Sequence, residues 1–310
     1  MTYEKIDVYA NISIGIIKYK MESKVNEPKK IDSVVTLTFG EQAENGRQMK
    51  KVASGKGGLA PEGMTVEELQ AFIPMLEKAG FTPEWKNLGD LLAGTSAKIK
   101  GTETTIMDIV EPAGILIVRG FANKVLEKYG GAEALYWEQL GLNWDRRCKM
   151  YGVVREKKAR RNLCYSNFSQ EPNYEAGLGR VYEWKNIPLT ALIRAAISDS
   201  FGPKAQGLQG EGNWYYDPEK CGIGFHGDAE RRIVYAVRAG LGMPLEYRWF
   251  YQGRQIGEPW MTTVNGGDLY IMSHKAAGTD WRLRRIPTLR HAAGAKKFRT
   301  LKKTQRKLEA

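Results

Sequence analysis

The sequence of 310 residues contains little cysteine and little histidine, three of each. Cys148, Cys164 and Cys221 have no pairing spacing, so a disulfide framework and a zinc motif are both excluded and buried reduced thiols are expected. A membrane-spanning helix needs an apolar run of about eighteen residues, and no run in the sequence approaches that length. The first twenty residues carry charges and no small-residue cleavage site, unlike a signal peptide. These absences predict a soluble, cytoplasmic protein with no membrane partner.

A convincing nucleotide-binding loop is also lacking. GIGFHG (222–227) matches the glycine spacing of a dinucleotide fingerprint, but a turn precedes it and the strand-like run IVYAVR follows it. The fingerprint needs a strand before it and a helix after it, and no P-loop motif occurs in the sequence. Rossmann-type and P-loop enzymes are therefore excluded.

Positive charge is in excess, with a formal net charge of +12, and it is clustered. Residues 295–310 carry seven Lys or Arg against one Glu. A second cluster comprises Arg155, Lys157, Lys158, Arg160 and Arg161. Either cluster alone would suit a solvated surface, but two clusters with aromatic residues nearby favour nucleic acid as the partner, DNA rather than RNA. The second cluster is expected to contact phosphates.

The apolar pattern predicts three parts of the chain. Residues 1–105 are expected to form a small α/β module, with a hairpin of residues 1–20 and 33–39. A helix follows from Thr65, where TVEE supplies a capping box. Residues 299–310 are expected to be a basic tail.

Residues 106–298 are expected to form the main domain. A buried strand at 115–118 precedes helices at about 122–140 and at 188–201. Turns rich in Gly, Pro, Asn and Asp then separate six short strand-like runs: GNWYY, RRIVYAVR, LEYRWFY, PWMTTV, DLYIM and PTLRHA. This spacing is typical of a sandwich, jelly roll or small barrel. The fold class is therefore α+β, with a mainly β core and flanking helices.

His226 and Asp228 are the residues most indicative of chemistry. Side chains at i and i+2 on a strand share one face, so the pair can supply two corners of a facial triad that holds Fe(II). All three histidines lie between residues 226 and 291. Arg284 and Arg290 are six residues apart. On one strand their guanidinium groups would share a face and could clamp a dicarboxylate.

At this point the sequence resembles a known family. NWY (213–215), FHGD (225–228), GDLYIM (267–272) and RRIPTLR (284–290) occur in the order seen in AlkB-like Fe(II)/2-oxoglutarate-dependent dioxygenases, most closely a divergent viral or phage-type branch. The resemblance covers about residues 110–298. It implies a double-stranded β-helix, or jelly roll, and an enzyme that oxidises methyl or alkyl groups on nucleic-acid bases.

The resemblance also assigns residues. His226 and Asp228 would be catalytic iron ligands. The residues expected to bind 2-oxoglutarate are Asn213, Tyr215, Arg284 and Arg290. The aromatic residues of WYY (214–216) and YRWFY (247–251), with Trp260 and Trp281, could stack on an extruded base, although most suit a barrel core equally well.

The third ligand departs from the family pattern. The family's second histidine would fall near Asp280 and Trp281, and neither is His. His291 is adjacent to Arg290, so strand alternation would send it to the opposite face from that arginine. We expect His274 as the third ligand on ligand type, with Asp280 as the alternative on register.

Three functions remain open from the sequence. The first is a dioxygenase that hydroxylates or dealkylates a nucleic-acid base, in repair or in DNA modification. The second is a catalytically inactive nucleic-acid-binding protein on the same fold. The third is a hydroxylase of protein side chains, for which nucleic acid would not stimulate turnover.

Overall fold

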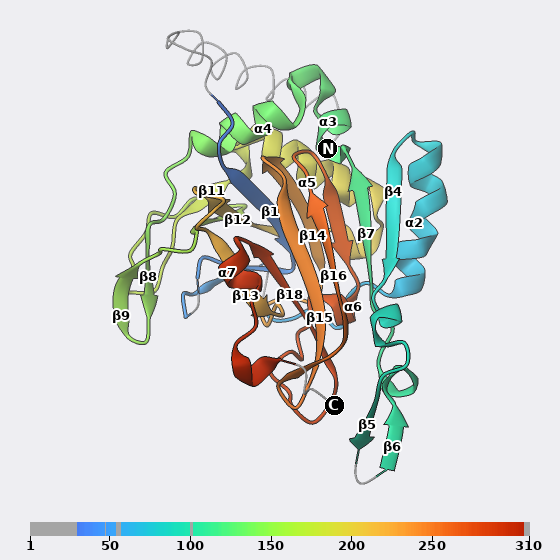
Figure 1. Cartoon of the computed structure of the whole chain (residues 1–310). Coiled ribbons are helices and arrows are strands. Elements are labelled where there is room, and N and C mark those ends of the chain that lie inside the picture. Colours follow the sequence, from blue (N-terminus) through green and yellow to red (C-terminus); the bar gives the residue numbers. More distant parts are fainter. Residues whose placement is uncertain (1–29, 47, 54–56, 100–101, 307–310) are drawn as a thin grey trace.

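The protein is seen in a computed structural model that describes residues 30–46, 48–53, 57–99 and 102–306. It is a mixed α/β structure rich in strands, with a large, mainly antiparallel sheet, a smaller antiparallel sheet and few helices (Figure 1). The first strand expected from the sequence, in residues 1–20, lies outside the described residues.

The large sheet has eight strands, and only its β10–β11 pair is parallel. Its strands, in spatial order, are β11 (Val181–Glu183), β10 (Arg161–Ser166), β12 (Gln209–Tyr215), β1 (Val34–Gly40), β14 (Val234–Gly240), β17 (Leu269–Met272), β7 (Gly114–Arg119) and β4 (Thr82–Asn87). The small sheet contains β13 (Gly222–His226), β18 (Thr288–Gly294), β15 (Met243–Tyr251) and β16 (Arg254–Val264), in that order. The six strand-like runs expected after Gly202 are thereby confirmed.

Three two-stranded hairpins extend from these sheets. They are β2 (Gln42–Glu44) with β3 (Lys51–Ala53), β5 (Ser96–Ile99) with β6 (Thr102–Thr105), and β8 (Arg147–Met150) with β9 (Val153–Glu156). The hairpin β5–β6 projects from the bottom of the molecule in Figure 1.

Strand β1 corrects the expected boundary at residue 105. It lies between β12 and β14, with Val34 opposite both Tyr215 and Gly240. Strand β4 pairs with β7 in the same sheet. Residues 30–105 therefore supply strands of the main sheet, and they do not form a separate module, because their hydrogen-bond partners come from later parts of the chain.

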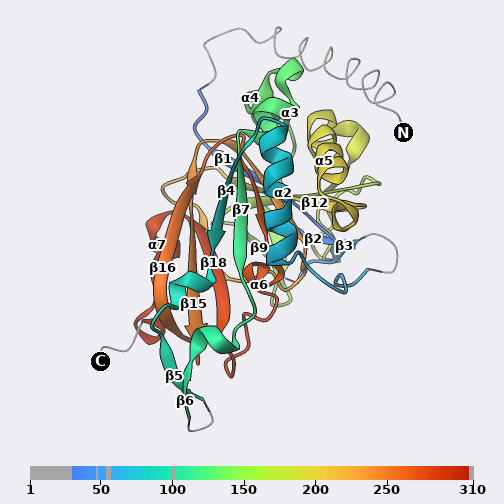
Figure 2. The same ribbon diagram turned by 90° about the vertical axis from the view of Figure 1, so that its right-hand side faces the viewer.

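Helices cover one face of the large sheet, and the small sheet lies against the other (Figure 2). The α-helices are α2 (Val66–Lys78), α3 (Phe121–Val125), α4 (Gly131–Leu140), α5 (Pro188–Ser200), α6 (His274–Ala277) and α7 (Lys296–Arg299). Short 3-10 turns are η1 (Gly89–Leu92), η2 (Ile106–Ile109), η3 (Glu127–Tyr129), η4 (Trp184–Asn186), η5 (Pro203–Ala205) and η6 (Lys303–Gln305). None of the helices in the described part of the chain combines the length and apolar character needed to cross a membrane.

Two sequence predictions about the helices have different outcomes. The capping box at Thr65 is confirmed, since its side chain accepts a hydrogen bond from the Glu68 backbone while Glu68 accepts one from the Thr65 backbone. The single helix expected at 122–140 is instead interrupted: α3 ends at Val125, η3 follows, and α4 begins at Gly131, where Gly130 and Gly131 adopt positive φ of 94° and 67°.

The expected buried, unpaired cysteines are confirmed: Cys148, Cys164 and Cys221 are all free and buried.

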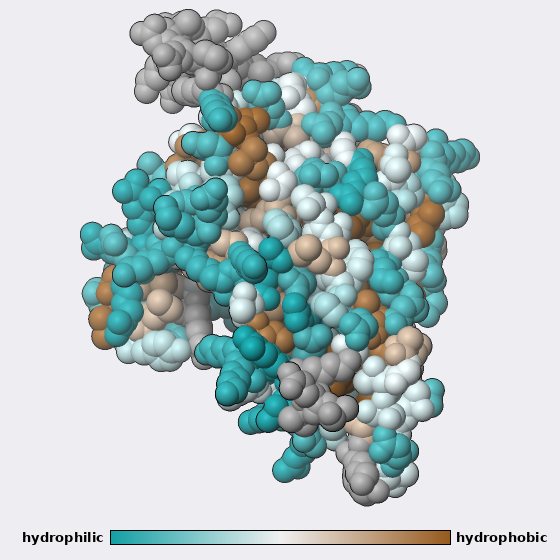
Figure 3. All heavy atoms as spheres, in the orientation of Figure 1, coloured by the Kyte–Doolittle hydropathy of each residue, from teal (hydrophilic) through white to brown (hydrophobic). Residues whose placement is uncertain are grey.

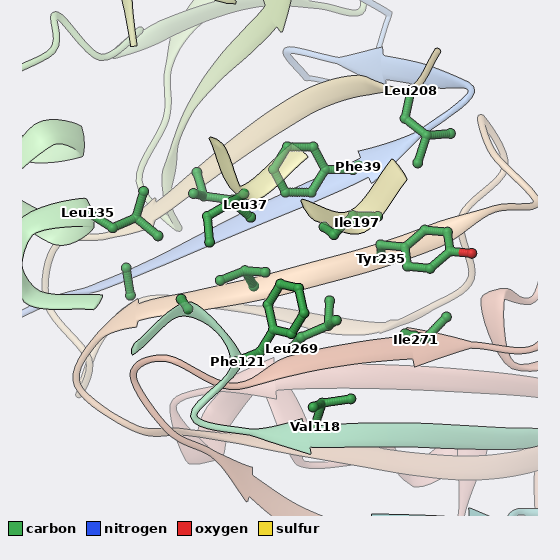
Figure 4. Packing of buried hydrophobic residues seen from close by; sticks show 14 of the residues in the cluster. Leu37, Phe39, Val118, Phe121, Leu135, Ile197, Leu208, Tyr235, Leu269 and Ile271 are labelled. Atoms are coloured by element: carbon green, nitrogen blue, oxygen red, sulfur yellow. The ribbon is translucent and has the colours of Figure 1, made fainter. Parts of the chain in front are cut away.

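Two apolar layers hold the structure together. The first fills the space between the helices and the large sheet, where Leu37 and Phe39 of β1 meet Ile197 of α5 (Figure 4). The second fills part of the space between the two sheets, where Tyr270 of β17 and Leu289 of β18 belong to one cluster. The alternation of side chains along each central strand therefore contributes to both layers.

Candidate metal centre

Between the two sheets the apolar packing gives way to a polar cavity of about 620 Å³. Its walls come from β1, β12, β14 and β17 on one side and from β13, β15 and β18 on the other. The volume lies within the range of about 300–1,000 Å³ that is usual for small-molecule sites. Its size and its polar lining make it the leading candidate for a functional site.

Three potential metal ligands converge in this cavity: His226, Asp228 and His291. Asp228 Oδ1 lies 3.7 Å from His226 Nε2 and 3.7 Å from His291 Nε2. The three ligand atoms all lie within 4.8 Å of one another. The two imidazoles come from residues that are paired across β13 and β18, so the antiparallel register brings the rings together.

The local backbone explains how His226 and Asp228 reach the same point. The register of β13 against β18 shifts between Ile223 and His226, and such irregularities re-aim side chains near functional sites. Gly227 then packs against α6, where a Cβ atom would lie 2.0 Å from the Gly278 carbonyl oxygen. The Asp228 backbone N–H donates to Ala277 at 2.8 Å. A residue larger than glycine between the two ligands would therefore push this turn away from α6.

Hydrogen bonds select the tautomer of His226. Its Nδ1 lies 2.8 Å from the Gly224 carbonyl and 3.0 Å from the His291 carbonyl. Carbonyl oxygens only accept, so Nδ1 carries the proton and Nε2 keeps its lone pair on the side of Asp228. This is the arrangement of a metal-binding imidazole held by a backbone acceptor.

Burial sets the protonation of the three groups. It lowers the pKa of His226 to about 4, with help from the Arg160 charge, and it holds the pKa of His291 well below its usual value. Burial and Glu230 raise the pKa of Asp228 to about 8, against the opposing charge of Arg231. Both imidazoles are therefore neutral at physiological pH, which is the form that binds metals, and Asp228 would release its proton to an incoming cation.

The donor set fits a divalent transition metal. A metal ion with bonds of ~2.1 Å can bridge two ligand atoms up to ~4.2 Å apart, so both His–Asp distances are within reach. Two imidazoles and one carboxylate form the facial triad of non-haem Fe(II) sites, in which the remaining positions stay open.

Asn213 and Tyr215, expected to bind a cosubstrate, both line this cavity. They stand at i and i+2 on β12 and so share its inner face. Asn213 Oδ1 accepts hydrogen bonds of 2.6 Å from Arg160 Nε and from Asn162 Nδ2. Tyr215 is buried, and burial raises the pKa of its hydroxyl. Asn213 is therefore held in a fixed orientation, with its amide already engaged.

His274 was the wrong choice for the third member of the cluster. It begins α6, with its Nδ1 3.5 Å from Glu111, and His291 takes the place beside His226 and Asp228. Asp280, the alternative, pairs with Lys275 at 2.5 Å. Alternation along β18 correctly predicted that Arg290 and His291 point to opposite faces. The faces themselves were reversed, because His291 points inward together with Leu289 and Ala293, and Arg290 does not.

Arg284 and Arg290 do not line the cavity, which corrects their expected role in binding 2-oxoglutarate. The strand β18 begins only at Thr288, so Arg284 lies in the preceding loop and the two residues do not share a strand. Arg284 is exposed and donates to the Gln252 carbonyl at 3.0 Å. Arg290 points to the outer face of the small sheet, over the Phe250 ring at 4.3 Å.

Arg238 is a cavity residue that sequence reasoning missed. It lies on β14 with 1% of its surface exposed, and its Nη1 donates to the Thr36 hydroxyl of β1. Among the described residues, no carboxylate lies within ion-pair distance of it, and its Nε has no partner. A buried charge without a counter-charge is costly, so its retention points to an anionic ligand. The signal in the sequence was a lone arginine within the apolar strand VYAVRAG.

The basic cluster at 155–161 does not form one surface. Arg160 lines the cavity, while Lys157 turns inward and donates to the Asn45 carbonyl at 2.5 Å. Arg161 stacks on the rings of Trp214 and Tyr216, at 4.8 Å and 4.7 Å. Arg155 and Lys158 are exposed. The expected phosphate-contacting group is thus reduced to these two exposed side chains.

Fold and site together define a class: a strand-rich protein with two main sheets and, in the cavity between them, a cluster of two imidazoles and one carboxylate. No protein-family model matches the sequence. The chain is 37% identical over 268 residues to "Uncharacterized protein R156" of Acanthamoeba polyphaga mimivirus, and the match spans 86% of this chain and 98% of that protein. The chain belongs to the same family as this viral protein.

Proposed function

We propose that this protein is an Fe(II)- and 2-oxoglutarate-dependent dioxygenase of the AlkB-like type, acting on a base in nucleic acid. The observation that carries the proposal is the His226–Asp228–His291 cluster, enclosed in a cavity that also contains an unpaired, buried arginine. A facial triad beside a cationic group suits a metal ion that is chelated by an anionic cosubstrate.

The topology supports a jelly roll as the framework of the site. From β12 to β18 the chain passes repeatedly between the sheets: β12, β14 and β17 belong to the large sheet, and β13, β15, β16 and β18 to the small one. Strand β1 fills the place between β12 and β14, which makes four facing strands in each sheet. Eight strands in two facing sheets are the number found in jelly rolls. The central position would then be occupied by a strand from the N-terminal part of the sequence.

His226, Asp228 and His291 would hold the iron from one side and leave the cavity side open. Bound together, Fe(II) and 2-oxoglutarate supply the activation of oxygen and the oxidation of a substrate carbon, chemistry that belongs to the cofactors. The carbonyl oxygens of Gly224 and His291 fix the His226 ring, while Arg231 Nε, 3.8 Å from Asp228 Oδ2, stabilises the ionised carboxylate. The protein thereby presents three oriented ligands before the metal arrives.

Arg238 is the residue best suited to hold the distal carboxylate of 2-oxoglutarate. Its guanidinium and the Thr36 hydroxyl both line the cavity. Tyr215 and Tyr270 line the same cavity, and burial raises the pKa of both hydroxyl groups. The two tyrosines would exclude water along the cosubstrate.

Nucleic acid as the substrate rests on charge and on the resemblance described above. The net charge of +12 favours a polyanion. Trp281, which lines the cavity from the loop before β18, offers a ring on which an extruded base could stack.

The test is succinate formation from 2-oxoglutarate when oxygen is admitted to protein reconstituted anaerobically with Fe(II), with and without a single-stranded oligonucleotide. Wild type should make succinate, and the oligonucleotide should stimulate it. His291→Ala should lose metal affinity by ~100-fold or more, because even supporting residues of metal ligands contribute ~10–100-fold.

His274→Ala is the matched control, since it removes an imidazole that lies outside the cluster. It should retain both the metal and turnover. Loss of metal in His274→Ala but not in His291→Ala would reject the assigned cluster. Wild type that binds the oligonucleotide without retaining iron or making succinate would favour a binding protein without turnover.

A further inference from the structure

A second cavity, of about 360 Å³, opens on the outer face of the small sheet and is rich in arginine. Its lining residues are Gly253, Trp281, Arg282, Arg284, Arg290, Thr304 and Gln305, here called the arginine pocket. No carboxylate occurs among these residues, all of which belong to the described part of the chain. Three guanidinium groups thus surround one hollow without a counter-charge in its walls.

Arg290 is held in place by two aromatic rings. Its guanidinium lies 4.3 Å from the centre of the Phe250 ring and 5.6 Å from that of Trp281. Only 8% of its surface is exposed, and its Nε has no hydrogen-bond partner among the described residues. The two rings hold the guanidinium in place, so its N–H groups are pre-organised to donate to an acceptor that the described residues do not supply.

The other two arginines leave the positive charge equally uncompensated. Arg284 donates to the backbone carbonyl of Gln252 at 3.0 Å, and Arg282 lies over the Trp281 ring at 5.2 Å. The acid that acts on Arg290 is Asp280, which is already paired with Lys275 at 2.5 Å. A ligand that enters this pocket therefore meets a concentrated positive field.

The same face carries further basic residues, but those have acidic partners. A neighbouring hollow contains Arg248 and Arg299, and both pair with Glu246. Hydrophilic residues gather over α7 and the segment after it in Figure 3, which views this side of the molecule. The arginine pocket differs from this hollow by having no acid in its walls.

The arginine pocket and the metal cavity share a wall. Trp281 and Arg282 line both of them, in the loop that leads into β18. Two consecutive residues of β18 then point into opposite spaces, His291 into the metal cavity and Arg290 into the pocket. A ligand in the pocket would therefore sit next to the wall of the metal cavity.

We propose that the arginine pocket binds a backbone phosphate of the nucleic-acid substrate and so positions one strand beside the metal cavity. The identity of the polyanion rests on the proposed function. Arginine matches phosphate because its planar fork donates two parallel hydrogen bonds to two oxygens, and such contacts position a strand without reading its sequence.

The experiment measures the affinity of a fluorescent single-stranded oligonucleotide by anisotropy at several salt concentrations. Arg284→Gln removes a pocket arginine that is exposed, so its loss should not disturb folding. Arg285→Gln is the matched control, because Arg285 is exposed in the same loop and is not a lining residue. Arg290→Lys is a second variant that keeps the charge but loses the planar fork.

Arg284→Gln should weaken binding by ~5-fold at 0.1 M salt and lower the slope of log affinity against log salt by ~0.7, equally for different base sequences. Arg290→Lys should also weaken binding. Arg285→Gln should bind within about twofold of wild type, as expected for an exposed charge outside the contact.

Three outcomes would overturn the inference. Equal affinities of Arg284→Gln and Arg285→Gln would do so, and so would failure of the wild type to bind the oligonucleotide. The third is that millimolar inorganic phosphate binds in a way that depends on Arg284, while Arg284→Gln leaves the oligonucleotide affinity unchanged. That result would indicate a site for small anions. Succinate formation by the unaltered protein is measured in parallel. If no succinate forms, the dioxygenase is rejected, but an oligonucleotide affinity that depends on Arg284 would still support the arginine pocket.

Discussion

The two buried faces of the large sheet differ in composition where the metal cavity lies, although the rest of the face toward the small sheet is apolar. On β1, Val35, Leu37 and Phe39 join the apolar layer under the helices, while Thr36 and Thr38 line the metal cavity. Strand β14 repeats this difference, with Tyr235 and Val237 toward the helices and Arg238 in the cavity. One set of strands therefore stabilises the fold with one face and supplies chemical groups with the other, so substitutions on the two faces should have separable effects.

Leu37→Ala should give the largest loss of stability, because it opens a hole in the layer under the helices. Leu37 is fully buried, and such truncations cost ~2–5 kcal/mol of the free energy of unfolding. Urea denaturation measures this loss, with Leu241→Ala, 39% exposed, as the control. The metal affinity of the folded variant should match that of wild type. A large drop in that affinity would show that the two faces are not independent.

Arg238→Met should have the opposite pattern. Replacing a buried charge that has no counter-charge by an apolar side chain of similar length should leave the free energy of unfolding unchanged or raise it, by up to ~4 kcal/mol. The affinity for 2-oxoglutarate should fall by ~2 kcal/mol, roughly 30-fold, as for the loss of one partner of a buried charge pair. Calorimetry with the Fe(II) protein under anaerobic conditions measures the affinity, and the exposed Arg254→Met is the control. Unchanged 2-oxoglutarate affinity would remove Arg238 from the site.

Glu138→Gln tests a carboxylate that is buried on the helix side of the large sheet, at the start of α5. Burial raises the pKa of Glu138 to about 7, although its oxygens accept hydrogen bonds from the Leu189 and Thr190 backbones. The folded state therefore keeps a proton that the unfolded state, with a pKa of 4.5, releases. This contribution to stability is present below pH 4.5 and is lost as the pH rises through about 7.

Wild type should consequently lose ~1–3 kcal/mol more than Glu138→Gln between pH 5 and pH 8. Denaturant midpoints at the two pH values measure the difference, and Glu133→Gln, exposed on the same helix, should behave like wild type. Parallel pH dependences of wild type and Glu138→Gln would contradict the raised pKa.

Local patterns predicted more of this molecule than patterns that depend on distant pairing. The close approach of His226 and Asp228, the shared face of Asn213 and Tyr215, and the cap at Thr65 each follow from a few consecutive residues. The inward face of β18 does not, because it is decided by pairing with β13 and β15. Alternation alone could separate Arg290 from His291, but it could not say which of them points inward.

The same limit explains the errors about Arg238 and the chain boundary. An arginine in an apolar strand gives no local sign of whether it faces solvent or a cavity. The position of β1 depends on pairing with strands that begin only at Gln209, so the segment before residue 105 resembled an independent module. The clamp assigned to Arg284 and Arg290 failed because a proline, Pro287, and a loop separate Arg284 from the strand.

The central place of β1 also constrains how the protein can fold during translation. Val34 pairs with Tyr215 and Gly240, and these two residues are synthesised only after most of the chain has been made. At about 5–20 residues per second, a nascent β1 would wait ~10–40 s for its neighbours to leave the ribosome. Until then its backbone groups form an open edge that can pair with other chains. A ribosome that stalls before β14 would therefore release a polypeptide without the centre of its sheet, and such fragments should aggregate or be degraded.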